Sequence, residues 1–180
     1  MRLERQARAL ARNPLGGLPA PDADFGIGPQ PRSPGLSFKT LMRDYFVAVV
    51  PLDHALAKRD SVNFEELLKH SLVMTTSDTN ERLIVDQAAQ RLRRPIRPRF
   101  DLAHNFSVGR LVAVGLGLTI VPTTAIQSLG AEKLKIIDVK SPRIFRELGL
   151  MSRPNYRPSP SVQAFMAVLD GAVRVQAGRG

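Results

Sequence analysis

Residues 100–122, FDLAHNFSVGRLVAVGLGLTIVP, constrain the fold more than any other stretch of the chain. Apolar residues at helical spacing followed by a glycine predict a helix and its end, and these residues are Val108, Leu111, Val112 and Gly115. The run of residues 116–121 carries three β-branched residues and stops at Pro122, which is typical of a central strand covered on both faces. With a first strand before the helix, the stretch predicts an α/β fold.

The start of this helix is the first candidate site. Asn105 and Ser107 are the candidate caps. A helix that begins at the carboxyl end of a strand directs free backbone N–H groups beyond the sheet edge, where open α/β sheets bind ligands. We therefore expect ligand contacts at residues 104–107.

A second helix start follows the predicted strand of residues 72–75. Asp78 and Glu81 have the spacing of a capping box. The residues expected to bury this helix are Leu83, Ile84, Ala88 and Leu92. If the two strands are parallel neighbours, both starts face one crevice and suit a small anionic or polar ligand.

Spacing alone supports two interpretations of these helix starts equally. The side chains either contact a ligand or only cap the helices. The predicted ligand-binding residues are Thr75, Thr76, Ser77, Asp78, His104, Asn105, Phe106 and Ser107. The resemblance described below favours ligand contact.

The remaining segments alternate between strand and helix patterns. Further strands are expected at residues 22–28, 36–41, 45–50, 134–139 and 147–152. Short helices are expected after Asn63, which has Glu66 three residues later, and at residues 125–128. The last helix is expected to begin at Ser159 and Pro160 and to bury an apolar stripe of Val162, Phe165, Met166 and Leu169.

Three segments resemble the effector-binding module of LysR-type transcriptional regulators. LVAVGLGLTIVP at residues 111–122 is similar to the family's glycine-rich turn and apolar strand ending in proline. DADFGIG at residues 22–28 resembles a strand of the first lobe, and VVPLDHALAKRD at residues 49–60 resembles the crossover to the second. Ala55 replaces the family's usual proline, which lessens the rigidity of that turn. His54 has no nucleophile arrangement beside it, so we interpret it as a residue that stabilises the turn.

The resemblance implies a two-lobed α/β fold like that of type II periplasmic binding proteins. A basic tail of residues 1–20, expected to fold poorly, precedes a first lobe of residues 21–60 and 143–180 and a second lobe of residues 61–142. Neither the family's winged helix-turn-helix nor the opening strand and helix of the first lobe is recognisable. We therefore expect an incomplete first lobe in a chain truncated at its amino terminus.

The function implied is that of an effector-binding regulatory domain, which holds a small anionic metabolite between its lobes to control transcription. The implied partners are this effector, further copies of the chain in a homo-oligomer, and DNA only through a winged helix-turn-helix domain absent from this chain. No cofactor and no enzymatic activity are implied. The alternative is a solute-binding protein of the same fold, against which the missing export signal argues.

The net charge of +10 raises the question of nucleic-acid binding. Two groups of arginines lie in the tail and at residues 91–99, and cations in the second group offset the dipole of the preceding helix. A solvated surface is the favoured interpretation. With no helix-turn-helix and no aromatic-rich RNA-binding signature, no DNA-binding residues are assigned.

Other classes of site are disfavoured by composition and spacing. The chain has no cysteine, which excludes disulfides and thiolate metal sites, and its three histidines lack a recognised ligand spacing: His54, His70 and His104. Gly115 and Gly117 follow a helix and enter a strand, the reverse of a nucleotide-binding loop. No apolar run reaches the roughly 20 residues that span a bilayer. We expect a cytoplasmic protein without metal or membrane contacts.

Overall fold

The computed structural model describes residues 24–31, 35–130 and 132–177. The chain divides into two compact units, Met1–Arg43 with Arg146–Gly180, and Asp44–Phe145. The predicted tail of residues 1–20 lies outside the described residues. The lobe boundaries expected at residues 60 and 142 stay a prediction.

The first unit contains β1 (Gly26–Pro29), the first part of β2 (Ser37–Pro51), most of β8 (Phe145–Ser152) and α5 (Pro160–Ala177). β1 pairs antiparallel with β8, and β8 lies next to β2 in the sheet. The strand expected at residues 22–28 begins at Gly26, and its first two residues lie outside the described part of the chain. The two strands expected at residues 36–41 and 45–50 are one continuous strand, β2.

The predicted apolar stripe of α5 is less buried than expected. Phe165 stacks near Phe25, with ring centroids 5.6 Å apart, yet half of it is exposed. Val162, Met166 and Leu169 are half-buried. The expectation that Phe165 is a core residue was therefore wrong, because one aromatic contact leaves much of its surface in water.

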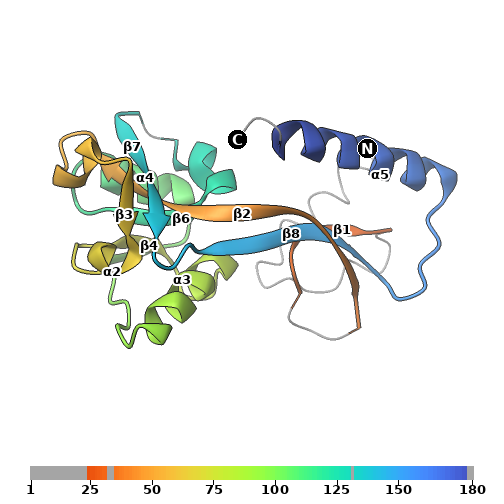
Figure 1. The fold of residues 1–180 in the computed structure, drawn as a ribbon, viewed down its shortest axis with the longest axis horizontal. Coiled ribbons are helices and arrows are strands. Elements are labelled where there is room, and N and C mark those ends of the chain that lie inside the picture. Colours follow the sequence, from red (N-terminus) through yellow and green to blue (C-terminus); the bar gives the residue numbers. More distant parts are fainter. Residues whose placement is uncertain (1–23, 32–34, 131, 178–180) are drawn as a thin grey trace. The chain divides into compact units, whose positions relative to one another are not determined.

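The second unit is built on a sheet around the last part of β2 (Figure 1). β6 (Thr119–Pro122) and β7 (Leu134–Lys140) flank β2 and are antiparallel to it, and β3 (Ser61–Asn63) runs parallel to β7. β4 (Val73–Thr75) and β5 (Phe100–Leu102) form a parallel pair. A parallel bridge between Leu72 and Leu118 joins this pair to the segment entering β6. The buried strand predicted at residues 116–121 is confirmed from Thr119 onward, since all of β6 is buried, whereas Leu116 and Gly117 precede the strand and are half-buried.

Alternating residues of β2 divide the core of this unit into two faces. Phe46, Ala48 and Val50 belong to a core with residues of α2 (Phe64–Leu67) and α3 (Asn80–Arg91). Val47 and Val49 belong to a core with residues of α4 (Asn105–Ala113) and η2 (Thr123–Leu129). Because successive side chains of a strand point to opposite faces, this run is apolar throughout. The sheet is thus covered by helices on both sides.

The predicted end of α4 is confirmed in detail. Gly115 has φ 80°, and its N–H donates to the carbonyl of Val112, while Leu116 donates to Leu111. This pair of bonds is a Schellman motif, in which the residue after the cap is left-handed and favours glycine. Within α4, Gly109 allows a close approach, because an added Cβ would overlap the backbone of Leu129.

The predicted caps were wrong at both helix starts. The cap of α3 is Thr79 rather than Asp78, and the cap of α4 is His104 rather than Asn105 or Ser107. The buried side of α3 was also predicted only in part: Ala88 is buried, as are Arg82, Val85 and Ala89, whereas Leu83, Ile84 and Leu92 are half-buried. The buried residues of α3 recur three and four positions apart, and this spacing defines the face toward the core.

Candidate functional site

The two helix starts lie at the same edge of the sheet, as the site hypothesis requires. Thr75 at the end of β4 pairs with Leu102 at the end of β5, and the N–H of Thr76 donates to the carbonyl of Leu102 at 3.1 Å. α3 and α4 begin within a few residues of these strand ends. Their free backbone donors therefore open at the carboxyl edge of one parallel pair.

At the start of α3, hydrogen bonds within the protein engage two predicted residues. The Thr79 hydroxyl donates to the carbonyl of Thr76 at 3.0 Å and accepts from the N–H of Arg82 at 3.3 Å. Since its only proton is used, the 2.9 Å contact between the hydroxyls of Thr75 and Thr79 has Thr75 as the donor. Thr75 is buried and structural in this geometry, whereas Ser77 and Asp78 are exposed.

Arg82 stabilises this start from inside the protein, and sequence reasoning missed it. Its Nη1 donates to the carbonyl of Thr75 at 2.9 Å and to Asp101 at 2.6 Å, and its Nε donates to Asp86 at 3.0 Å. Burial lowers the pKa of Arg82, but the hydrogen bonds to Asp86 and Asp101 outweigh burial and raise the pKa above its usual value. One guanidinium thus connects β4, β5 and α3.

The start of α4 has a more open construction. His104 is exposed, and its side chain makes no capping hydrogen bond. Phe106 is 57% exposed, with the guanidinium of Arg110 6.0 Å from its ring centroid. Ser107 is half-buried in the first turn. The backbone donors of this turn have no side-chain cap.

Two buried amide oxygens lie at equivalent places in the two helices. Asn80 is the first residue of α3 and Asn105 the first residue of α4. The Oδ1 atom of each is buried and has no hydrogen-bond partner within the described part of the chain. An unpaired buried acceptor costs about 1–3 kcal/mol, so each atom suits a donor supplied from outside the protein.

Asn105 was among the predicted site residues and Asn80 was not. A signal for Asn80 was present in the sequence, because each helix begins with a cap residue followed by asparagine, Thr79–Asn80 and His104–Asn105. The spacing argument used the capping box at Asp78 instead. The structure therefore adds Asn80 to the candidate site.

The histidines are structural or isolated in the described residues. The Nδ1 atom of His54 accepts from the N–H of Leu56 at 3.2 Å at the start of η1 (Ala55–Lys58), as expected of a turn-stabilising residue. The ring of His70 lies 5.1 Å from that of His54. Burial and the nearby His70 lower the pKa of His54, and Asp53 acts against them. Across residues 24–31, 35–130 and 132–177, no three side chains of the metal-ligating types gather.

The comparison with protein families matches the LysR substrate binding domain over residues 10–174. The HTH-type transcriptional regulator YbhD of Escherichia coli is 27% identical over 149 residues, which are 82% of this chain and 47% of that protein. The RuBisCO operon transcriptional regulator of Allochromatium vinosum is 27% identical over 156 residues, 86% of this chain and 52% of that protein. The chain thus spans about half the length of these curated relatives.

Solved structures of this family have the same fold. The CcmR regulatory domain of Synechocystis, solved in complex with 2-PG, aligns with a TM-score of 0.73 and 20% identity, over 94% of this chain and 79% of that one. The effector binding domain of QuiR, solved with shikimate, aligns with a TM-score of 0.71 and 24% identity, over 84% of this chain and 72% of that one. No described helix is long and apolar enough to cross a membrane.

The fold is thus the α/β fold of type II periplasmic binding proteins, as expected from the sequence. The family match covers most of the chain, including both helix starts. The chain therefore belongs to the LysR substrate binding domain family.

Proposed function

We propose that this domain binds a small anionic metabolite at the starts of α3 and α4 and regulates transcription within a LysR-type regulator. One observation carries the proposal: two helix starts share the edge of the β4–β5 pair, and each has a buried, unpaired amide oxygen, that of Asn80 or Asn105. Backbone N–H groups at helix starts favour anionic oxygens. The amide oxygens require hydrogen-bond donors, so the ligand class is an acid that also carries hydroxyl or amino groups.

The relatives support the regulatory part of this proposal. YbhD and the Allochromatium vinosum protein are named as transcriptional regulators, and the QuiR and CcmR domains were solved with the small molecules shikimate and 2-PG. We also propose that the chain acts in a homo-oligomer. We further propose that sequence-specific DNA recognition belongs to a winged helix-turn-helix outside this domain, and that the domain catalyses no reaction.

The predicted contact residues, with Asn80 added from the structure, divide into three groups in this proposal. His104, Asn105, Phe106 and Ser107 are the ligand contacts from α4, and Thr76, Ser77, Asp78 and Asn80 are those from the start of α3. Thr75 shapes the edge by donating to Thr79. We keep the lobe boundaries expected from the resemblance: residues 21–60 and 143–180 form the first lobe, and residues 61–142 form the second.

Thermal melts with a panel of hydroxy acids, amino acids and aromatic acids test the proposal. A ligand that prefers the folded state raises the melting temperature by mass action. For any compound that does so, Ser107→Ala and Thr76→Ala should weaken binding in calorimetry without lowering the melting temperature of the unliganded protein.

Ser71→Ala is the matched control, because Ser71 is exposed and precedes the opposite end of β4. It should leave the affinity unchanged. Equal affinities in the control, Ser107→Ala and Thr76→Ala would remove these two residues from the site.

A further inference from the structure

An arginine-rich loop follows α3 and has no part in the proposed effector site. Residues 91–99 read RLRRPIRPR, and all five arginines are exposed: Arg91, Arg93, Arg94, Arg97 and Arg99. Among the residues that the structure describes, one carboxylate pairs with them, that of Glu65 with Arg94 at 2.9 Å. The loop therefore carries more positive charge than its surroundings neutralise.

The offsetting of the helix dipole explains only a small part of this cluster. Arg91 is the basic residue in the last turn of α3, and the other four arginines lie beyond the helix. The dipole effect falls off within the last turn. The structure thus weakens dipole compensation, one of the reasons for which a solvated surface was the favoured interpretation of the sequence.

The backbone of the loop is fixed at several points. The N–H of Arg94 donates to the carbonyl of Ala89 at 3.0 Å, and the N–H of Arg99 donates to the carbonyl of Leu72 at 2.8 Å. Ile96 packs against the core between α3 and the sheet. Pro95 and Pro98 restrict the chain further. The arginines are therefore presented by an ordered backbone, which lowers the entropic cost of binding a partner.

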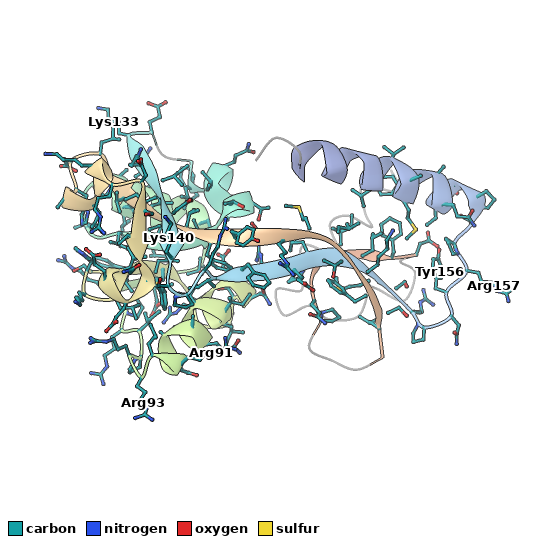
Figure 2. The ribbon with its side chains drawn as sticks, viewed as in Figure 1. Arg91, Arg93, Lys133, Lys140, Tyr156 and Arg157 are labelled. Atoms are coloured by element: carbon teal, nitrogen blue, oxygen red, sulfur yellow. The ribbon has the colours of Figure 1, made fainter. Side chains whose placement is uncertain are left out.

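The part of the loop next to α3 faces solvent at Arg93. Arg93 has φ 56°, which turns the chain sharply at the end of α3. Figure 2 shows the side chain of Arg93 extending away from the ribbon beyond that end. A long partner could thus contact Arg93 without displacing the protein's own contacts.

We propose that residues 91–99 form a sequence-independent contact surface for the phosphate backbone of duplex DNA. A guanidinium matches two phosphate oxygens with two parallel hydrogen bonds, and its charge releases condensed counterions from the duplex. This surface is separate from the helix starts, and the inference stands whether or not the proposed effector site is correct.

The apolar and aromatic residues of the loop disfavour other polyanions. Leu92 and Ile96 pack against the core and are not available for insertion into a lipid surface. Phe100 packs against the second core and lies beneath Arg99, at 5.4 Å from its guanidinium, so it offers no free ring on which an unpaired base could stack. A regular duplex backbone needs neither insertion nor stacking.

The test is fluorescence anisotropy of a short labelled duplex of arbitrary sequence, titrated with the whole chain over a range of salt concentrations. The triple variant Arg91→Ser, Arg93→Ser and Arg97→Ser leaves the Arg94–Glu65 pair intact. Each lost phosphate contact reduces the slope of log affinity against log salt by about 0.9, so the slope should fall by roughly 3. The affinity at low salt should fall with it.

Two further variants control for net charge and for folding. Lys58→Ser, Lys133→Ser and Lys140→Ser remove the same charge from exposed positions outside the loop, and Figure 2 shows Lys133 and Lys140 at opposite ends of β7. This variant should keep the slope. Replacing the three loop arginines by lysine should also keep most of it, because the charge remains.

Equal slopes in the two serine triples would overturn the proposal. A duplex slope in the loop variant equal to that of the wild type would also overturn the proposal. This holds even if the variant lost binding to phosphatidylserine vesicles or to polyglutamate. If the serine triple fails to melt cooperatively, the single variant Arg93→Ser decides. The proposal requires its slope to fall by about 0.9, and an unchanged slope rejects it.

Discussion

The starts of α3 and α4 occupy equivalent places in the fold but differ in construction. At the start of α3, Thr79 caps the helix, and the buried guanidinium of Arg82 connects β4 and β5. At the start of α4, the side chain of the cap residue His104 makes no capping hydrogen bond, and Phe106 is largely exposed. The comparison teaches that a protein can stabilise one helix start internally and leave its neighbour's backbone donors available for a ligand.

The largest expected effect is the loss of Arg82. Arg82→Ala should lower the free energy of unfolding by roughly 2–3 kcal/mol, because it leaves a buried carbonyl and two carboxylates without their donor. We place the value below that of a fully buried ion pair, since the side chain of Asp101 is half exposed. Urea unfolding measures the change.

Arg110→Ala is the matched control for this prediction. Arg110 is an exposed arginine of α4 that lies over the ring of Phe106. Its loss should cost about 0.5 kcal/mol or less. If both arginine variants unfold at the same urea concentration, the two helix starts do not differ as described.

The caps provide the next largest contrast. Thr79→Ala should cost about 1–2 kcal/mol, since it removes the cap of α3 and the acceptor for the hydroxyl of Thr75. His104→Ala should cost less than about 0.5 kcal/mol, because no side-chain cap is lost. Thermal and urea unfolding of the two variants would show the contrast, and equal losses would contradict it.

Substitution of Asn105 should lower the affinity for a ligand without lowering the stability of the fold. Asn105→Ala removes a buried acceptor without a partner and should leave the free energy of unfolding unchanged or raise it by about 0.5 kcal/mol. The affinity for a ligand identified in the thermal panel should fall in calorimetry. A variant that lost stability while its ligand affinity stayed the same would show that the amide serves the fold.

The smallest effect is one of pH, and it arises away from both helix starts. The folded pKa of His54 is lowered, so the unfolded chain binds the proton more tightly. The stability that depends on neutral His54 is fully present above the ordinary value of 6.5 and declines as the pH falls below it. Melts of the wild type and His54→Gln at successive pH values should converge as the pH falls.

This pH effect also sharpens the comparison of the helix starts. The variants at Arg82, Thr79 and His104 should be compared above pH 6.5, where His54 contributes fully. A difference between wild type and His54→Gln that stays constant across the series would exclude His54 as the source of the acid sensitivity.

Several features of the fold were predictable because they depend on neighbours along the chain. Gly115 ends α4 as expected, since its left-handed backbone is a local requirement. Residues 118–121 of the predicted run 116–121 are buried as expected, and His54 stabilises its turn. The strand between residues 37 and 51 was divided in two because Arg43 and Asp44 interrupt its apolar pattern. Asp44 is in fact fully buried and accepts hydrogen bonds from Thr123 and Thr124.

The candidate site was predictable in position more than in detail. The ends of residues 72–75 and 100–102 were expected to lie together only if their strands were parallel neighbours, and they are. The cap at Thr79 was missed because Asp78 has Glu81 three residues later, as a capping box requires, whereas the third residue after Thr79 is Arg82. Arg82 was missed because an arginine in a helix is normally exposed, and only its carboxylate and carbonyl partners allow its burial.

The sequence by itself determined the backbone elements of this domain, because helical spacing, β-branched runs and a left-handed glycine act over a few residues. Tertiary structure decided which strands are neighbours, which threonine caps α3 and which arginine is buried. Those outcomes depend on partners far apart in the chain, such as Asp101 for Arg82 and Leu102 for Thr76. Their free energies arise only when the sheet has assembled, so no short pattern encodes them.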